Sequence, residues 1–140
     1  MGNSLTGQGP RVGCGAAIII DRRILLIRRL KHPEAQAWGL PGGKVDVFES
    51  LQAAIMREVS EELGITLHAP RFLCNVEYLD PPAGEHWISA IYQAQDYAGE
   101  PKLMEPDKHG GFGWFDLDEL PKPLTWATIC TPDFIRAKTI

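Results

Sequence analysis

The feature that most constrains the fold of this chain is a helix with two different faces, predicted between Ser50 and Gly64. Ser50 is a suitable N-cap, and Gly64 supplies the stop. Between them, apolar residues recur at helical spacing: Leu51, Ala54, Ile55, Val59 and Leu63. This stripe predicts a helix that packs one face on a hydrophobic core and keeps the other face for a different role.

The second face of this helix is acidic. In "REVSEELGI", Arg57 to Ile65, the residues Glu58, Glu61 and Glu62 fall within about 100° of arc, because each helical residue advances by about 100°. Carboxylates at these spacings repel one another by on the order of a few tenths of a kcal/mol per pair. Either water screens the charges, or a cation is expected beside them.

The rest of the chain alternates between predicted strands and helices. We expect strands at 12–20 and 24–30, which form a hairpin, a short extended piece at 38–40, strands at 72–79 and 87–94 joined by the turn "DPPAGE", and a strand at "GFGWFDL". A C-terminal helix is expected at 124–137, with a break possible at Pro132. These elements predict one α/β domain over residues 11–140, after a flexible tail at 1–10.

Composition narrows the classes of function. The chain has 140 residues, a one-domain length, and a net charge of -4, so no broad cationic surface for a nucleic acid polymer is expected. The longest apolar run, "AAIII", is far too short to span a bilayer, and no membrane partner is expected. The three cysteines show neither a CxxC pair nor zinc spacing. We interpret them as reduced thiols of a cytoplasmic protein.

The acidic helix and the glycine-rich loop before it form one longer pattern. From Gly43 the chain runs through five residues to Glu49, through seven more to Arg57, and then reads "REVSEELGI". This is similar to the complete Nudix box, GX5EX7REUXEEXGU, in which U is an aliphatic residue. Nine fixed or class-restricted positions over 23 residues match, and none departs. On this resemblance the chain is identified as a member of the Nudix hydrolase family.

The resemblance implies a fold and a cofactor. The fold would be a Nudix α/β/α sandwich with a mixed β-sheet and a loop-helix-loop box. The cofactor would be Mg²⁺, with Mn²⁺ as an alternative, and hard cations of this kind prefer oxygen ligands. The implied ligands are the carbonyl of Gly42 and the carboxylates of Glu58, Glu61, Glu62 and Glu105, with Asp107 as the alternative to Glu105.

The resemblance also implies a reaction, the hydrolysis of a nucleoside diphosphate linked to another group. A metal-bound water would attack phosphorus in line. Glu61 and Glu58 are the two candidates for orienting or deprotonating that water. Arg57 would hold the glutamates in place by ion pairing, with Glu49 as its expected partner. Gly43, a substrate-binding candidate, allows a backbone shape that a Cβ would hinder.

The stretch from Glu100 to Trp126 refines the expected substrate. It is similar to the corresponding segment of plant and animal Nudix enzymes that hydrolyse nucleoside triphosphates, including oxidised or modified dGTP, to the monophosphate and pyrophosphate. Asp107 and Phe112 are mild departures from that pattern. By this resemblance Arg29 would meet the substrate phosphates, and Trp126 would line the base pocket and stack on the base. A position in the core is the alternative for Trp126.

The sequence leaves alternatives for the substrate. Pro81 resembles a marker of ADP-ribose pyrophosphatases, although "DPPAG" is also ordinary turn chemistry. Nucleotide sugars and isoprenoid diphosphates are further substrate classes, and a nucleotide-sensing module without turnover is the non-enzymatic alternative. Dimerisation is common in the family, which makes a homodimer possible, but no residue indicates an interface.

The histidines are not expected to form a site. His32, His68, His86 and His109 show no metal-ligand spacing, and we expect all four in loops or at the surface. His32 and His109 are the two nearest to the inferred cleft.

Overall fold

The computed structural model describes residues 9–138, except for the side chains of residue 134 and residues 136–138. Most of the predicted flexible tail, 1–10, therefore lies outside the described residues. In chain order the elements are β1 (Arg11–Ile20), β2 (Arg23–Arg29), β3 (Trp38–Gly39), β4 (Gly42–Lys44), α2 (Leu51–Leu63), β5 (Thr66–Leu67), β6 (Arg71–Asp80), the 3₁₀ turn η1 (Pro81–Ala83), β7 (Glu85–Ala94), β8 (Tyr97–Ala98), β9 (His109–Asp116) and α3 (Trp126–Lys138).

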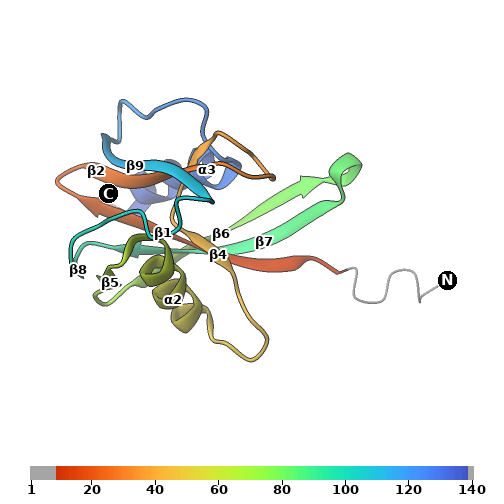
Figure 1. Cartoon of the computed structure of the whole chain (residues 1–140), viewed down its shortest axis with the longest axis horizontal. Coiled ribbons are helices and arrows are strands. Elements are labelled where there is room, and N and C mark those ends of the chain that lie inside the picture. Colours follow the sequence, from red (N-terminus) through yellow and green to blue (C-terminus); the bar gives the residue numbers. More distant parts are fainter. Residues whose placement is uncertain (1–8, 139–140) are drawn as a thin grey trace.

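A mixed sheet is organised around β1 (Figure 1). This strand runs parallel to β7 and antiparallel to β2 and β4, while β6 extends the sheet beyond β7, and β9 and β3 flank β2. The β1–β2 hairpin turns at Asp21 and Arg22, which have φ angles of 52° and 65°. Positive φ angles at both central residues suit the twist of a two-residue hairpin. The predicted hairpin is therefore confirmed.

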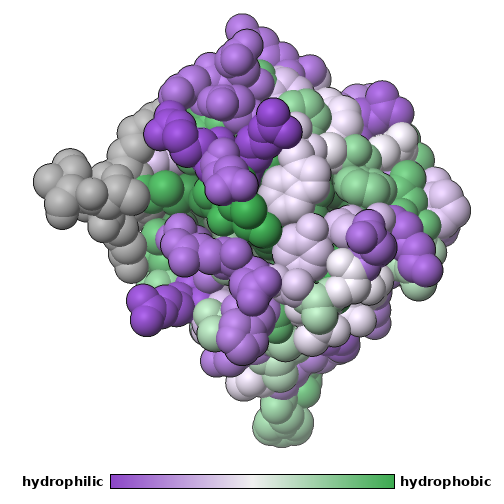
Figure 2. Space-filling view, turned by 90° about the vertical axis from the view of Figure 1, so that its left-hand side faces the viewer, coloured by the Kyte–Doolittle hydropathy of each residue, from purple (hydrophilic) through white to green (hydrophobic). Residues whose placement is uncertain are grey.

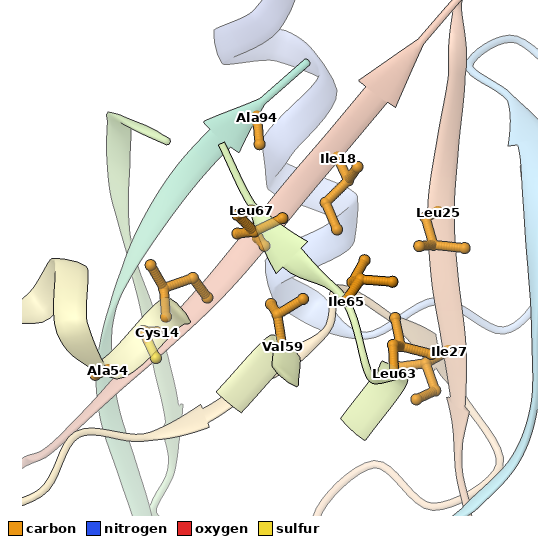
Figure 3. Packing of buried hydrophobic residues seen from close by; sticks show 12 residues of the cluster. Cys14, Ile18, Leu25, Ile27, Ala54, Val59, Leu63, Ile65, Leu67 and Ala94 are labelled. Carbon is orange, nitrogen blue, oxygen red and sulfur yellow. The ribbon is translucent and has the colours of Figure 1, made fainter. Parts of the chain in front are cut away.

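The two long helices cover opposite faces of this sheet. On β1, Cys14, Ala16 and Ile18 belong to the buried cluster that α2 joins through residues such as Val59 (Figure 3). The intervening Ala17 belongs to a second buried cluster, which α3 joins through Ile135. Because successive side chains of a strand point to opposite faces of a sheet, the two clusters lie on opposite sides of β1. The expected α/β/α sandwich with a mixed sheet is confirmed.

Helix α2 has the predicted ends and the predicted core face. The Ser50 Oγ accepts a hydrogen bond from the Ala53 N–H at 3.1 Å, and Gly64 ends the helix with a φ of 69°. Four residues of the apolar stripe, Ala54, Ile55, Val59 and Leu63, are 0% exposed. The fifth, Leu51, was expected in the core but is 36% exposed, because it lies in the first turn, ahead of the part of α2 that packs on the sheet.

The structure differs from the sequence prediction in its short elements and in α3. The strand β4 and the small β5–β8 sheet were not predicted, because segments of two or three residues carry no readable periodicity. Helix α3 begins at Trp126 rather than at residue 124, since Leu124 forms a β-bridge with Trp38. The break considered at Pro132 is absent: α3 continues through it, and the Thr131 hydroxyl donates to the Ala127 carbonyl oxygen at 2.7 Å.

The outer surface carries exposed hydrophobic residues only in small groups on the face drawn in Figure 2. Val47 and Phe48, in the loop between β4 and α2, are 81% and 104% exposed. This loop is held by polar contacts, among them a hydrogen bond of 3.0 Å from the Asp46 N–H to Glu49 Oε1.

No helix within residues 9–138 has the length and apolar character needed to cross a membrane.

Candidate functional site

Arg57 connects the acidic face of α2 to the loop that precedes it. Its Nε and Nη2 donate to the two carboxylate oxygens of Glu49 at 2.7 and 2.9 Å. Its Nη1 donates to Glu61 Oε1 at 2.9 Å, and its Nη2 also donates to the Lys44 carbonyl oxygen at 3.0 Å. The hydrogen bonds from Arg57 lower the pKa of Glu49 to about 2. The expected Arg57–Glu49 pair is present, and it fixes Glu61 relative to the loop.

Glu62 is the buried carboxylate of the site. Its side chain is 9% exposed, and Oε1 accepts a hydrogen bond from the Gly42 N–H at 2.8 Å. Its Oε2 lies 3.4 Å from His109 Nε2. Burial raises the pKa of Glu62 to about 8, with smaller contributions from the negative charges of Glu58 and Glu105. A buried carboxyl with a pKa this high is one that a nearby cation would convert to the charged form.

Glu58 and Glu61 differ in their surroundings. The Glu58 side chain is 15% exposed and lies 3.5 Å from Arg57 Nη1, whereas the Glu61 side chain is 51% exposed. Burial raises the pKa of Glu58, and the neighbouring Glu61 adds to the shift while Arg57 opposes it. A Cβ at Gly43 would overlap the Glu58 carboxylate. The glycine is therefore needed at this point, because it lets the β4 backbone approach the carboxylate.

His109 is placed differently from the prediction. It was expected at the surface or in a loop, but it is the first residue of β9 and is 5% exposed. Pairing of β9 with β2 places His109 opposite Arg29. The backbone N–H of His109 donates to the Glu105 carbonyl oxygen at 3.1 Å. These backbone contacts place the imidazole of His109 in the protein interior, and this burial lowers the pKa of His109. The expectation of an exposed His109 was wrong.

Glu62, Glu105 and His109 form a group that could hold a metal ion. Each offers one ligand atom, and these atoms all lie within 4.8 Å of one another. No hydrogen-bond partner is present for the buried His109 Nδ1 among the described residues. The only signal for His109 in the sequence is its position four residues after Glu105. Asp107, the alternative to Glu105, is exposed.

The donor set fits a divalent cation. Glu62 of α2 comes together with Glu105 from the loop before β9, and hard cations such as Mg²⁺ take oxygen ligands of this kind. Gly42 lies beside Glu62, to which its N–H donates, while the role predicted for the Gly42 carbonyl oxygen as a metal ligand stays a prediction. Mn²⁺ suits the same carboxylates, and the imidazole of His109 suits transition metals better than it suits Mg²⁺.

A cleft of about 320 Å³ reaches Gly42, whose N–H donates to Glu62 of the metal-ligand group. It is lined by the three substrate-binding candidates, Arg29, Gly43 and Trp126, and also by Gly42. The Arg29 Nε donates to the Pro33 carbonyl oxygen at 2.7 Å. Trp126 is 45% exposed, so the alternative of a core position does not hold for it. The structure thus brings the predicted metal-ligand residues and the predicted substrate-binding residues to one region of the molecule.

Three aromatic or acidic residues of the cleft were missed in the sequence. Tyr78 and Trp87 come from the hairpin β6–β7, and Glu34 comes from the loop between β2 and β3. The Trp87 Nε1–H donates to Glu85 Oε1 at 2.8 Å. Pro81 lies in the exposed turn η1 between β6 and β7 and does not line the cleft, in agreement with its interpretation as a turn residue.

The comparisons with known proteins show the family. The model of the NUDIX domain family matches residues 9–135, so the chain belongs to the NUDIX domain family. The family found in the sequence from the box alone is thereby confirmed.

Relatives with solved structures or assigned activities include three that are informative. A MutT NUDIX hydrolase from Burkholderia pseudomallei has 53% identity and a TM-score of 0.90, over 91% of this chain and 98% of that chain. The ADP-ribose pyrophosphatase of Methanocaldococcus jannaschii is 34% identical over 81% of this chain and 66% of that protein. The oxidized purine nucleoside triphosphate hydrolase of Danio rerio is 30% identical over 79% of this chain and 69% of that protein. The chain spans about two thirds of the length of the latter two relatives.

Proposed function

We propose that this chain is a divalent-metal-dependent hydrolase of nucleoside triphosphates, including oxidised or non-standard ones, which releases a nucleoside monophosphate and pyrophosphate. The observation that carries the proposal is that Gly42 and Gly43, which lie against the Glu62 and Glu58 carboxylates of α2, line the same cleft as Arg29 and Trp126. A site of this kind provides ligands for a cation, a guanidinium for phosphate oxygens and a ring for a base.

Metal binding and activation of water are assigned to the glutamates. Glu62, Glu58 and Glu105 would hold the cation, Mg²⁺ or Mn²⁺, with Gly42 beside them, and the cation would neutralise phosphate oxygens and activate water. Glu61 is the exposed carboxylate that Arg57 fixes in place, so it is our first candidate for orienting or deprotonating water and for a contact to the metal. Glu58 is the second candidate for the base.

Arg29, Gly43 and Trp126 are assigned to binding of the substrate. Arg29 would contact the phosphates, and the short distance between the β4 backbone and Glu58 at Gly43 would let the phosphates approach the carboxylates closely. The half-exposed ring of Trp126 would stack on the base. The proposal includes a small-molecule nucleotide as the partner, a cytoplasmic location and assembly as a homodimer.

A second candidate function is hydrolysis of ADP-ribose or a nucleotide sugar. The relative from Methanocaldococcus jannaschii, an ADP-ribose pyrophosphatase, favours it. The relative from Danio rerio, an oxidized purine nucleoside triphosphate hydrolase, supports the first proposal. Both reactions would use the same carboxylates, so the products distinguish them and the metal site does not.

A product-resolved assay tests the proposal. The purified protein with Mg²⁺ is incubated with canonical and oxidised nucleoside triphosphates, ADP-ribose, a nucleotide sugar and geranyl diphosphate, and the products are separated by chromatography. We expect a nucleoside monophosphate plus pyrophosphate from triphosphates, with activity lost in Glu61→Gln. Release of AMP and ribose 5-phosphate from ADP-ribose alone would refute the proposal in favour of the second candidate. Tight Mg²⁺-dependent nucleotide binding without any product would indicate a sensing module.

A further inference from the structure

Glu34 is a charged residue of the cleft to which the proposed function gives no role. It lies in the loop between β2 and β3, and it lines both the cleft and a neighbouring groove. The loop, orange in Figure 1, runs close to α3. Tyr78 and Trp126 also line both cavities. Because a carboxylate repels phosphates, this part of the cleft suits a different portion of a nucleotide.

The backbone that presents Glu34 is strained. Glu34 and Gln36 have φ angles of 58° and 71°, in the left-handed region that residues other than glycine rarely adopt. The loop is nevertheless closed by backbone hydrogen bonds, from the Gln36 N–H to the Arg29 carbonyl oxygen at 2.7 Å and from the Ala37 N–H to the Glu34 carbonyl oxygen at 3.2 Å. Strain of this kind persists only where the surroundings enforce it, and it concentrates at functional sites.

A hydrogen bond from α3 fixes the Glu34 carboxylate. The Trp126 N–H, in the first turn of α3, donates to Glu34 Oε1 at 2.7 Å. The start of α3 is held independently, because the Thr125 N–H donates to the Trp38 carbonyl oxygen at 2.9 Å and the buried hydroxyls of Thr125 and Thr128 are 2.7 Å apart. The helix is therefore the fixed partner, and the bond orients the carboxylate of Glu34.

An oriented carboxylate beside an exposed ring can select among bases. Carboxylate oxygens accept hydrogen bonds and cannot donate them. Guanine presents two neighbouring N–H donors on one edge, from N1 and N2, whereas adenine, cytosine and uracil place an acceptor beside the donor on that edge. Oxidation at C8 leaves this edge of guanine unchanged. The Trp126 ring, 45% exposed, offers the face on which such a base would stack.

We propose that Glu34 is a specificity-determining residue, whose carboxylate favours nucleotides with a guanine-type base over those with adenine, cytosine or uracil. This inference rests on the proposed function, because it assigns the base end of the same cleft. Glu34 would contact the base, and it would take no part in the chemical step.

The test compares Glu34→Gln with the matched control Glu77→Gln. The glutamine amide oxygen can still accept from the Trp126 N–H, so the loop stays closed, but an NH₂ donor replaces the second acceptor oxygen. Glu77 lines the neighbouring groove but not the cleft. The readout is kcat/KM for GTP, ATP, CTP, UTP and 8-oxo-dGTP with Mg²⁺, alongside the melting temperature of each variant.

We expect the wild type to prefer guanine nucleotides. In Glu34→Gln the ratio of kcat/KM for GTP to that for ATP should fall at least about tenfold, mainly through KM, because the contact is to the base. Glu77→Gln should keep the wild-type ratio. A wild type that prefers ATP, or a Glu34→Gln variant that slows all nucleotides by one common factor, would overturn the inference and leave Glu34 with a structural role.

Failure of the proposed function would look different. If the wild type hydrolyses no triphosphate, the proposed function fails, and the same ratio is then measured as the affinities for GMP and AMP by calorimetry. If Glu34→Gln does not fold, Glu34→Asp takes its place: it keeps an acceptor, so the preference for guanine should weaken without reversing.

Discussion

Replacing Glu62 by glutamine should stabilise the metal-free protein while it abolishes activity. The Glu62 side chain is 9% exposed, and burial raises its pKa from 4.5 to about 8. A carboxyl whose pKa is higher in the folded state contributes stability below the unfolded value, and that contribution is lost as the pH rises towards the folded value. The cost of burying Glu62 therefore grows between pH 4.5 and about pH 8.

The size of the effect follows from the two pKa values. Glu62 keeps its proton in the folded state at pH 7, which is about 2.5 units above the unfolded pKa of 4.5. Each unit corresponds to about 1.4 kcal/mol, which gives about 3.5 kcal/mol. Glutamine removes this term and keeps an oxygen for the Gly42 N–H. For a domain of this size, about 3.5 kcal/mol corresponds to a rise in Tm on the order of 10 °C.

The assay is thermal unfolding in EDTA over pH 4.5 to 8, with and without Mg²⁺. The Tm difference between Glu62→Gln and wild type should be small at pH 4.5 and should widen with pH. Mg²⁺ should raise the Tm of the wild type and have much less effect on the variant. Glu61→Gln is the control: its side chain is 51% exposed, so it should give no such stabilisation. A Glu62→Gln variant that is less stable than wild type in EDTA at pH 7 would refute the reasoning.

Two further predictions concern the backbone and the thiol beside the site. Gly43→Ala should lower kcat/KM by about 10² or more, since its Cβ would displace the Glu58 carboxylate and small misplacements are costly in catalysis. The control is Gly111→Ala, whose added Cβ would meet only Trp38, at 3.9 Å, and which should stay near wild-type activity. Equal losses of kcat/KM in both variants would contradict the prediction. Cys14 should react with a maleimide at pH 7.5 far more slowly in the folded than in the unfolded protein, because burial raises its thiol pKa to about 11; peptide mapping measures the labelling, and equal rates would refute the buried position.

The acidic helix could be predicted from the sequence because its determinants are local. Helix geometry fixes the angles between Glu58, Glu61 and Glu62 once the segment is helical. Ser50 and Gly64 mark its ends through capping chemistry, and the structure shows both caps. The position of these residues in a known motif also gave the family, which the domain match over residues 9–135 confirmed.

The differences among the glutamates were decided by tertiary structure. The three carboxylates look alike in the sequence, yet Glu62 is buried against Gly42 while Glu61 is half exposed. Which side of a helix is covered depends on where the sheet and the β4 loop lie, and no local pattern specifies this. The raised pKa of Glu62, about 8, is a consequence of its burial by the sheet and the β4 loop.

The sequence by itself thus determined the helix, its caps, the Arg57–Glu49 pair and the class of protein, because each depends on residues close together in the chain. The tertiary structure alone placed His109 beside Glu62 and joined Glu34 to Trp126, which are 92 residues apart. Contacts of this kind form only when β9 pairs with β2 and α3 packs beside the β2–β3 loop. Their energies depend on burial and distance, which spacing along the chain does not contain.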